Sequence, residues 1–150
     1  MRPRWHILFG VIFTILIWIA APKINLLFLL LVFLSTFLID FDHYLCFVLK
    51  TRKLGLFHSF SYHHEMIIQA KKDSAKGIRE KGDFHIFHTI EFHLFVGLLS
   101  FFWAGFFYIF IGMVFHSLLD IASLLYDNFM YVREFSLIRW IWRRYTIYNQ

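Results

Sequence analysis

The sequence predicts an all-α integral membrane protein, a four-helix bundle made of two helical hairpins. Two observations on composition and pattern favour this fold class. Of the 150 residues, 59% are hydrophobic and 17% are charged, whereas soluble domains carry about 25% charged residues. Long apolar runs also recur along the chain, and nearly all Lys and Arg residues lie outside them. We treat residues 1–150 as a single membrane domain.

The first hairpin is predicted from two uncharged runs on either side of a short turn. Residues 7–21 are apolar except for Thr14, and a second apolar run follows directly after Pro22 and Lys23. A second span so close behind the first favours a retained membrane helix over a cleaved signal peptide. We therefore predict helices at about 6–21 and 24–43.

The second hairpin is predicted from the length of the apolar region between Thr89 and Tyr126. At about 1.5 Å per residue, one helix of this length would be nearly twice as long as the ~30 Å hydrocarbon layer is thick. A turn near Ala104-Gly105 therefore divides the region into helices at about 87–103 and 106–126.

The distribution of basic residues gives the expected orientation. With four spans, every Lys and Arg except Lys23 lies on one side, in the N-terminal residues, the loop 50–84 or the tail 131–148. The positive-inside rule then makes this a multi-pass cell-membrane protein whose termini and loop are cytoplasmic. The middle of the loop is compatible with a surface helix, and the tail is typical of an amphipathic interfacial segment. The net charge of +5 fits contact with anionic membrane lipid, and we expect no nucleic-acid partner.

Polar groups from all four predicted helices share one depth in the membrane. Counted from the two outer turns, they lie within about two helical turns of one another, at the cytoplasmic boundary of the bilayer. An ionised Asp at the centre of a membrane helix costs on the order of 2.5–3.5 kcal/mol, and several carboxylates would repel each other. A bound divalent cation would remove both costs. The group comprises His6, Asp40, Asp42, His43, His88, Glu91, His93, His116 and Asp120.

The spacing of two pairs supports a metal site. His88 and Glu91 at i,i+3, and His116 and Asp120 at i,i+4, would each place two ligands on one helix face. Imidazole and carboxylate ligands without a thiolate suit a divalent transition metal, with zinc first and manganese or iron as alternatives. The sole cysteine, Cys46, cannot form an intramolecular disulfide.

The first aspartate pair is spaced differently. Asp40 and Asp42 at i,i+2 point to opposite sides of a helix, so either one of them ligates from an unwound helix end or only one ligates.

Three motifs in this order resemble a known family. IDFDHY at 39–44, HTIEFH at 88–93 and HSLLD at 116–120 resemble the D-x-D-H, H-x4-H and H-x3-D signature of the membrane-bound metal-dependent hydrolases. That group includes the LexA-binding, inner membrane-associated hydrolase. His6 resembles the family's early histidine, so the resemblance covers about residues 6–125. The family's second motif usually carries a basic residue after its first histidine, whereas here Thr89-Ile90-Glu91 follows His88.

The resemblance implies metal-assisted hydrolysis of a phosphoester or lipid. A bound ion lowers the pKa of a coordinated water toward neutrality, and a site at headgroup depth favours a phospholipid or another small amphiphile as substrate. Glu91 is the candidate general base unless it is itself a ligand, and His93 is a candidate supporting donor or leaving-group acid. We expect ligation by Asp42, His88, His116 and Asp120, with Asp40 and His43 ligating or supporting those ligands, and His6 as a further ligand.

Two other readings stay open at this point. A non-catalytic adaptor could use the metal only to hold its helices together, and the sequence identifies no protein partner. A membrane di-iron oxygenase would need several histidine boxes, of which HSFSYHH at 58–64 is one near match. A metal transporter is disfavoured because the outer halves of the predicted helices carry almost no polar residues.

Overall fold

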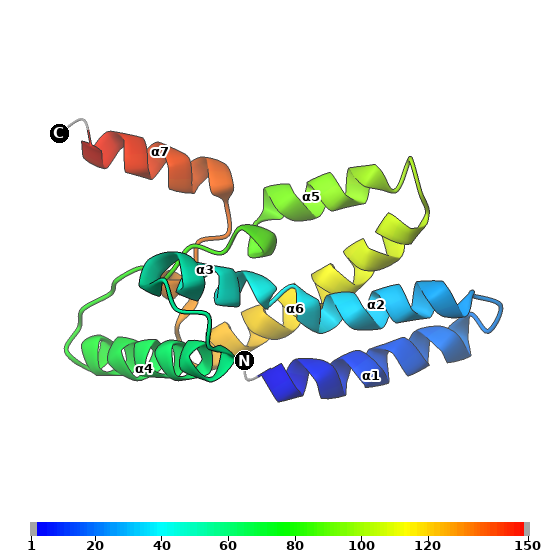
Figure 1. Cartoon of the computed structure of the whole chain (residues 1–150), viewed down its shortest axis with the longest axis horizontal. Helices are drawn as coiled ribbons and strands as arrows, with labels where there is room; N and C mark the ends of the chain where they lie inside the picture. Colours follow the sequence, from blue (N-terminus) through cyan, green and yellow to red (C-terminus); the bar gives the residue numbers. More distant parts are fainter. Residues whose placement is uncertain (1–2, 149–150) are drawn as a thin grey trace.

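The computed structural model describes residues 3–148, and all regular structure in this range is helical (Figure 1). The prediction of an all-α fold is thus confirmed. The helices are α1 (Pro3–Ala20), α2 (Leu26–Leu38), α3 (Phe41–Thr51), α4 (Leu56–Ala75), α5 (Ile90–Leu99), α6 (Gly105–Tyr126) and α7 (Leu137–Tyr148), with short 3-10 turns η1 (Ile86–His88) and η2 (Met130–Val132).

Four of these helices form two hairpins whose turns lie at the same end of the molecule (Figure 1). The first turn joins α1 to α2, where the Asn25 side chain caps α2 by accepting a hydrogen bond from the Leu27 amide at 2.9 Å. The second turn, at 100–104, joins α5 to α6 close to the predicted position. Helix α2 packs against both α1 and α6, and α6 packs against α5.

Glycine allows α2 and α6 to approach closely. A Cβ atom at Gly112 would overlap the Ser35 hydroxyl and the backbone carbonyl oxygen of Val32. The two helix backbones therefore meet at a point where any larger residue would force them apart. His116 follows Gly112 by one helical turn, so this contact also sets the position of His116 relative to α2.

The predicted helix 24–43 is interrupted. Helix α2 ends at Leu38, Ile39 and Asp40 form a turn, and α3 then continues to Thr51. Asp40 thus lies at the N-terminus of α3 rather than inside a continuous helix. The interruption separates the directions of the Asp40 and Asp42 side chains, in line with the unwound helix end that the i,i+2 spacing allowed.

A second interruption lies at the start of the predicted helix 87–103. Thr89 has an extended backbone (ψ 149°), and its hydroxyl caps α5 by accepting a hydrogen bond from the Phe92 amide at 3.3 Å. His88 therefore belongs to the η1 turn and not to α5, which begins only at Ile90.

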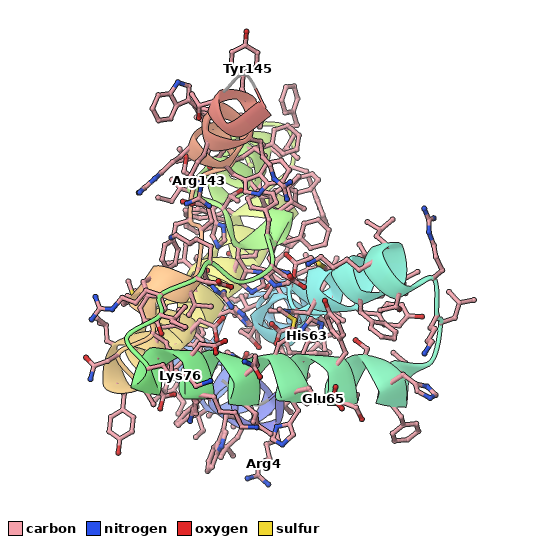
Figure 2. All side chains as sticks on the ribbon, turned by 90° about the vertical axis from the view of Figure 1, so that its left-hand side faces the viewer. Arg4, His63, Glu65, Lys76, Arg143 and Tyr145 are labelled. Atoms are coloured by element: carbon pink, nitrogen blue, oxygen red, sulfur yellow. The ribbon has the colours of Figure 1, made fainter. Side chains whose placement is uncertain are left out.

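Helices α4 and α7 lie at the end of the molecule opposite the two hairpin turns. Figure 2 views this end and shows α4 crossing the field, with His63 directed towards the body and Glu65 away from it. The His63 Nε2 atom contacts the backbone carbonyl oxygen of His43 at 3.0 Å, which ties α4 to α3. Helix α7 extends away from the hairpins (Figure 1) and exposes the apolar side chains Ile138, Ile141, Trp142 and Tyr145.

The hairpins expose apolar side chains and bury few of them. Among described residues, the buried hydrophobic cluster at their centre consists of Ile39, Val96 and Met113. Outward-facing side chains such as Ile19 and Leu26 remain 68% and 69% exposed. Two helical segments, Leu26–Thr51 and Gly105–Tyr126, are long and apolar enough to cross a membrane, whereas α1 and α5 are shorter apolar helices.

Candidate metal centre

Four side chains converge at the end of the hairpins opposite the turns. Asp40 comes from the start of α3, His88 from η1, and His116 and Asp120 from successive turns of α6. Each offers one nitrogen or oxygen atom, and all four atoms lie within 4.8 Å of one another. His88, His116 and Asp120 are buried, and the Asp40 side chain is 21% exposed. We call these four residues the convergent group. They could hold a metal ion.

The distances within the convergent group fit a tetrahedral site. The Nε2 atoms of His88 and His116 are 3.1 Å apart. Asp40 Oδ1 lies 3.6 and 3.5 Å from these two nitrogens, and Asp120 Oδ2 lies 3.8 and 3.6 Å from them. Tetrahedral zinc with bonds of about 2.0–2.2 Å separates its ligand atoms by about 3.4 Å. Only small movements, apart for the two nitrogens and inward for the carboxylate oxygens, would therefore place all four atoms on one ion.

The outer ring nitrogens fix how each histidine faces the group. His116 Nδ1 lies 2.8 Å from the carbonyl oxygen of Thr36, which can only accept, so Nδ1 carries the hydrogen. His88 Nδ1 likewise donates to Asp42 Oδ2 at 3.0 Å, and the same oxygen accepts the Phe87 amide at 3.0 Å. In the neutral imidazoles both Nε2 atoms then present lone pairs to the centre. Metal-bound histidines are held by the same outer bonds to carboxylates and carbonyls.

In this tautomer the inward-facing atoms of the convergent group are all acceptors, an arrangement that a cation between them would stabilise. Burial opposes protonation of His88, but its contacts with the Asp40 and Asp42 carboxylates outweigh burial and raise the pKa of this imidazole. The centre therefore favours positive charge at His88, supplied by a proton or by a metal ion.

His6 and Arg133 border the group on the side of Asp120. The His6 ring is fully buried and stacks on the His116 ring with centroids 4.0 Å apart. Its Nε2 atom is 3.2 Å from Asp120 Oδ1, while the Arg133 guanidinium lies 2.7 Å from Asp120 Oδ2. His6, a predicted ligand, thus contacts a member of the group without belonging to it.

Asp42 and His43, both predicted ligands, lie beside the group. Asp42 supports His88 from behind, and Asp42, His43 and His88 form a second set whose ligand atoms lie within 4.8 Å. His43 Nε2 is 3.5 Å from Asp40 Oδ1, and the His43 side chain is 26% exposed. The partly exposed Asp40 and His43 therefore mark the open side of the centre.

Glu91 does not face the convergent group, contrary to the sequence expectation. Its carboxylate accepts hydrogen bonds from the Ser136 hydroxyl at 2.6 Å and from the amides of Leu137 and Ile138 at 2.9 and 3.2 Å. These groups form the N-terminus of α7, so Glu91 caps that helix. The i,i+3 argument fails because the extended backbone at Thr89 separates His88 from α5.

His93 is buried between α5 and α6. Its Nδ1 atom donates to the carbonyl oxygen of Thr89 at 2.9 Å, and its Nε2 atom lies 3.0 Å from the Ser117 hydroxyl. These bonds join the two helices and turn the ring away from the convergent group, so the geometry gives His93 no contact with the proposed ion.

Sequence reasoning missed three contributors to the centre. Thr36 acts through a backbone carbonyl, which no sequence pattern reveals. No sequence feature distinguishes Arg133 from the other basic residues of the tail. His85 Nδ1 lies 3.8 Å from Asp42 Oδ1, and burial lowers the pKa of His85 to about 4, so this ring is neutral. The position of His85 three residues before His88 is the one feature of the sequence that points to a place near the centre.

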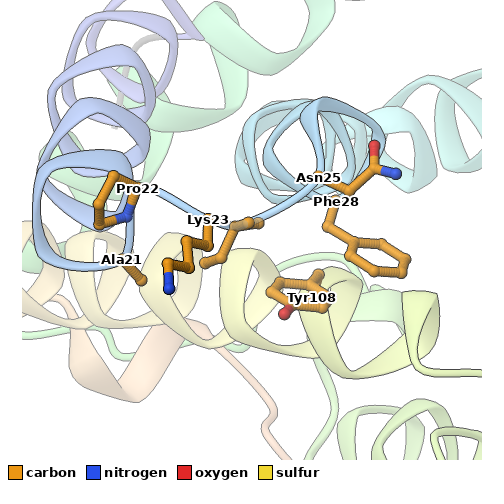
Figure 3. A pocket seen from close by; sticks show the side chains of 7 residues that line it. Ala21, Pro22, Lys23, Asn25, Phe28 and Tyr108 are labelled. Atoms are coloured by element: carbon orange, nitrogen blue, oxygen red, sulfur yellow. The ribbon is translucent and has the colours of Figure 1, made fainter.

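A hollow at the opposite end of the molecule is unrelated to this chemistry. It lies at the turn between α1 and α2 and is lined by Pro22, Lys23, Phe28 and Tyr108 among others (Figure 3). It contains no carboxylate or imidazole, so it offers no counterpart to the convergent group.

Comparison of the chain with protein-family models, with curated proteins and with solved structures finds no match. The case for a function therefore depends on the geometry of the centre and on the motifs that supply it.

Proposed function

We propose that this protein is a membrane-embedded, metal-dependent hydrolase that acts on a phospholipid or another amphiphilic phosphoester at the cytoplasmic membrane face. The observation that carries the proposal is the convergent group, in which two imidazole nitrogens and two carboxylate oxygens face one point. Two histidines and two aspartates suit zinc, with manganese and iron as alternatives.

The exposed apolar surface supports a position in the membrane. Side chains that are 68–69% exposed, such as Ile19 and Leu26, would face water in a soluble protein but acyl chains in a bilayer. We assign four spans, with α1 and α5 accompanying the two longer segments. Because every Lys and Arg of the described residues except Lys23 then lies at the end that holds the convergent group, we propose that this end and both termini are cytoplasmic.

The open side of the centre favours catalysis over a purely structural role. Structural zinc sites are closed by protein ligands, whereas catalytic sites keep a position for water or substrate. The four residues of the convergent group would fill a tetrahedral shell, so we propose that water enters by displacing Asp40, whose side chain is 21% exposed beside the 26% exposed His43. A bound ion would activate that water and polarise the scissile group. Thr36 and Asp42 would hold the two histidines in the orientation that ligation needs. Glu91 takes no part as a base because it caps α7.

A structural metal site is the second candidate, and one observation favours it. The convergent group joins α3, η1 and α6, and His6 adds α1 through its contact with Asp120. An ion there would hold together segments that share few buried apolar contacts.

Metal analysis and an activity assay separate the two candidates. We expect the full chain purified in detergent to contain a divalent transition metal, which His116→Ala or Asp120→Ala largely removes. The matched control His64→Ala, an exposed position on α4, should keep the metal. Metal-loaded protein should release phosphate or headgroup from a lipid panel. If it hydrolyses no phosphoester while its melting temperature depends on the ion, the structural role holds and the enzyme proposal fails.

Reporter fusions test the orientation separately. Fusions after Gln150 and within the loop 50–84 should both report a cytoplasmic location. An external location after Gln150 would contradict the four-span arrangement.

A further inference from the structure

Residues 130–136 form a segment between α6 and α7, here called the strap, that contacts the convergent group through Arg133. Hydrogen bonds from Gly82, Lys81 and Ile90 hold the strap in place around Arg133. The Gly82 amide donates to the Val132 carbonyl oxygen at 2.8 Å, and Lys81 Nζ donates to the Arg133 carbonyl oxygen at 2.8 Å. The Ile90 amide donates to the Phe135 carbonyl oxygen at 2.9 Å. The backbone is thus fixed before, at and after Arg133.

This fixation directs the Arg133 side chain at the centre. Its guanidinium lies 2.7 Å from Asp120 Oδ2, the carboxylate oxygen that belongs to the convergent group, and the side chain is only 14% exposed. Two neighbouring cations have another partner, since Lys81 and Arg143 approach the buried Glu134 carboxylate at 3.8 and 3.3 Å. Arg133 is therefore the cation that the strap delivers to the centre.

The charge balance gives Arg133 a role towards an anion. Asp40, Asp42 and Asp120 bring three negative charges to the centre, one more than a divalent ion neutralises. An approaching phosphoester would then meet net negative charge, and the Arg133 guanidinium removes this excess. Guanidinium groups have five donors in a plane and bind phosphate oxygens in pairs. One donor on Asp120 leaves others for an anion that approaches the centre beside Asp120.

We infer that Arg133 is the specificity-determining residue for a phosphate group, placed by the strap to bind the non-bridging oxygens of a phosphoester at the metal. This inference deepens the proposed function and rests on it for the identity of the site.

The test measures phosphate binding rather than turnover. Zinc-loaded full chain in detergent is titrated calorimetrically with inorganic phosphate and, separately, with a short-chain phosphatidic acid, which distinguishes a free phosphate from a lipid headgroup. Arg133→Gln should weaken binding of both probes about 10- to 100-fold, the usual effect of losing hydrogen bonds to a charged group. Arg133→Lys should restore part of the loss. Arg139→Gln is the matched control, because the Arg139 side chain is 68% exposed on α7 and forms its ion-pair contact with Glu134, at 3.9 Å, and not with the convergent group.

Zinc content is measured for each variant and should match the wild type. Phosphate affinity unchanged in Arg133→Gln would overturn the inference, and so would loss of zinc from both Arg133 variants, because Arg133 would then only hold Asp120. The proposed function can fail independently. If the wild type binds phosphate through Arg133 but hydrolyses no phosphoester, the inference about Arg133 holds and the proposed hydrolase activity is refuted.

Discussion

Glu91 offers the sharpest test of the structure, because its observed role differs from the role that the sequence suggested. Glu91→Gln keeps the side-chain shape but replaces one carboxylate oxygen with an amide nitrogen. Its carboxylate accepts three hydrogen bonds at the N-terminus of α7, from Ser136, Leu137 and Ile138. In the variant, one of these donors would face another donor.

The expected magnitude follows from these contacts. Loss of a helix cap typically costs about 1 kcal/mol, and loss of negative charge beside a helix N-terminus costs a further 0.3–1 kcal/mol, roughly. The free energy for opening the start of α7 should therefore fall by about 1–2 kcal/mol. Hydrogen exchange at the Leu137 and Ile138 amides should accelerate about 5- to 30-fold, since exchange follows local opening.

Metal content distinguishes capping from catalysis or ligation. Glu91→Gln should retain as much zinc as the wild type, because the carboxylate contacts α7 and not the convergent group. Glu65→Gln, at an exposed position on α4, is the control and should change neither exchange in α7 nor zinc content. A variant that loses zinc while α7 exchanges as in the wild type would refute this reasoning and return Glu91 to the metal centre.

Three further predictions address packing, ligand support and pH. Gly112→Ala should lower the free energy of unfolding by about 1–3 kcal/mol in thermal or denaturant unfolding, because its Cβ would overlap the α2 backbone. Asp42→Asn should weaken zinc binding about 10- to 100-fold in a competition titration with a chelator, since it weakens the bond that orients His88. Burial opposes ionisation of Asp83, but the hydrogen bond from the Lys50 ammonium outweighs burial and lowers the pKa of this carboxyl. Ionised Asp83 therefore stabilises the fold at neutral pH, and this stabilisation is lost as the pH falls through the lowered pKa. Asp83→Asn should thus reduce the melting temperature at neutral pH and match the wild type below that pKa.

The convergent group could be predicted from the sequence because depth along a helix follows directly from residue number. Each residue advances a helix by about 1.5 Å, so counting from two turns at one end identified the layer at the other end. Asp40, His88, His116 and Asp120 do meet there. The turn between α5 and α6, on which the counting depended, lies at 100–104, next to its expected place.

Side-chain direction could not be predicted in the same way, because it depends on an unbroken helix. The extended backbone at Thr89 separates His88 from Glu91, so their i,i+3 spacing does not place them on one face. The turn at Ile39 and Asp40 likewise sends Asp40 to the convergent group and leaves Asp42 behind His88. Each interruption is a matter of one or two residues, which helical periodicity does not resolve.

Arg133 shows a different limit, because its position depends on contacts distant in sequence. Its strap is held by Lys81, Gly82 and Ile90, and the close approach of Gly82 matters: a Cβ there would lie 2.8 Å from Val132 Cγ1. Helices of fixed rise bring the residues of the convergent group together, and hydrogen bonds between distant loops then determine which basic side chain borders that group. Two chains could therefore share the same ligand motifs and still differ in the cation beside the convergent group, since the strap is a separate segment from the helices that position that group.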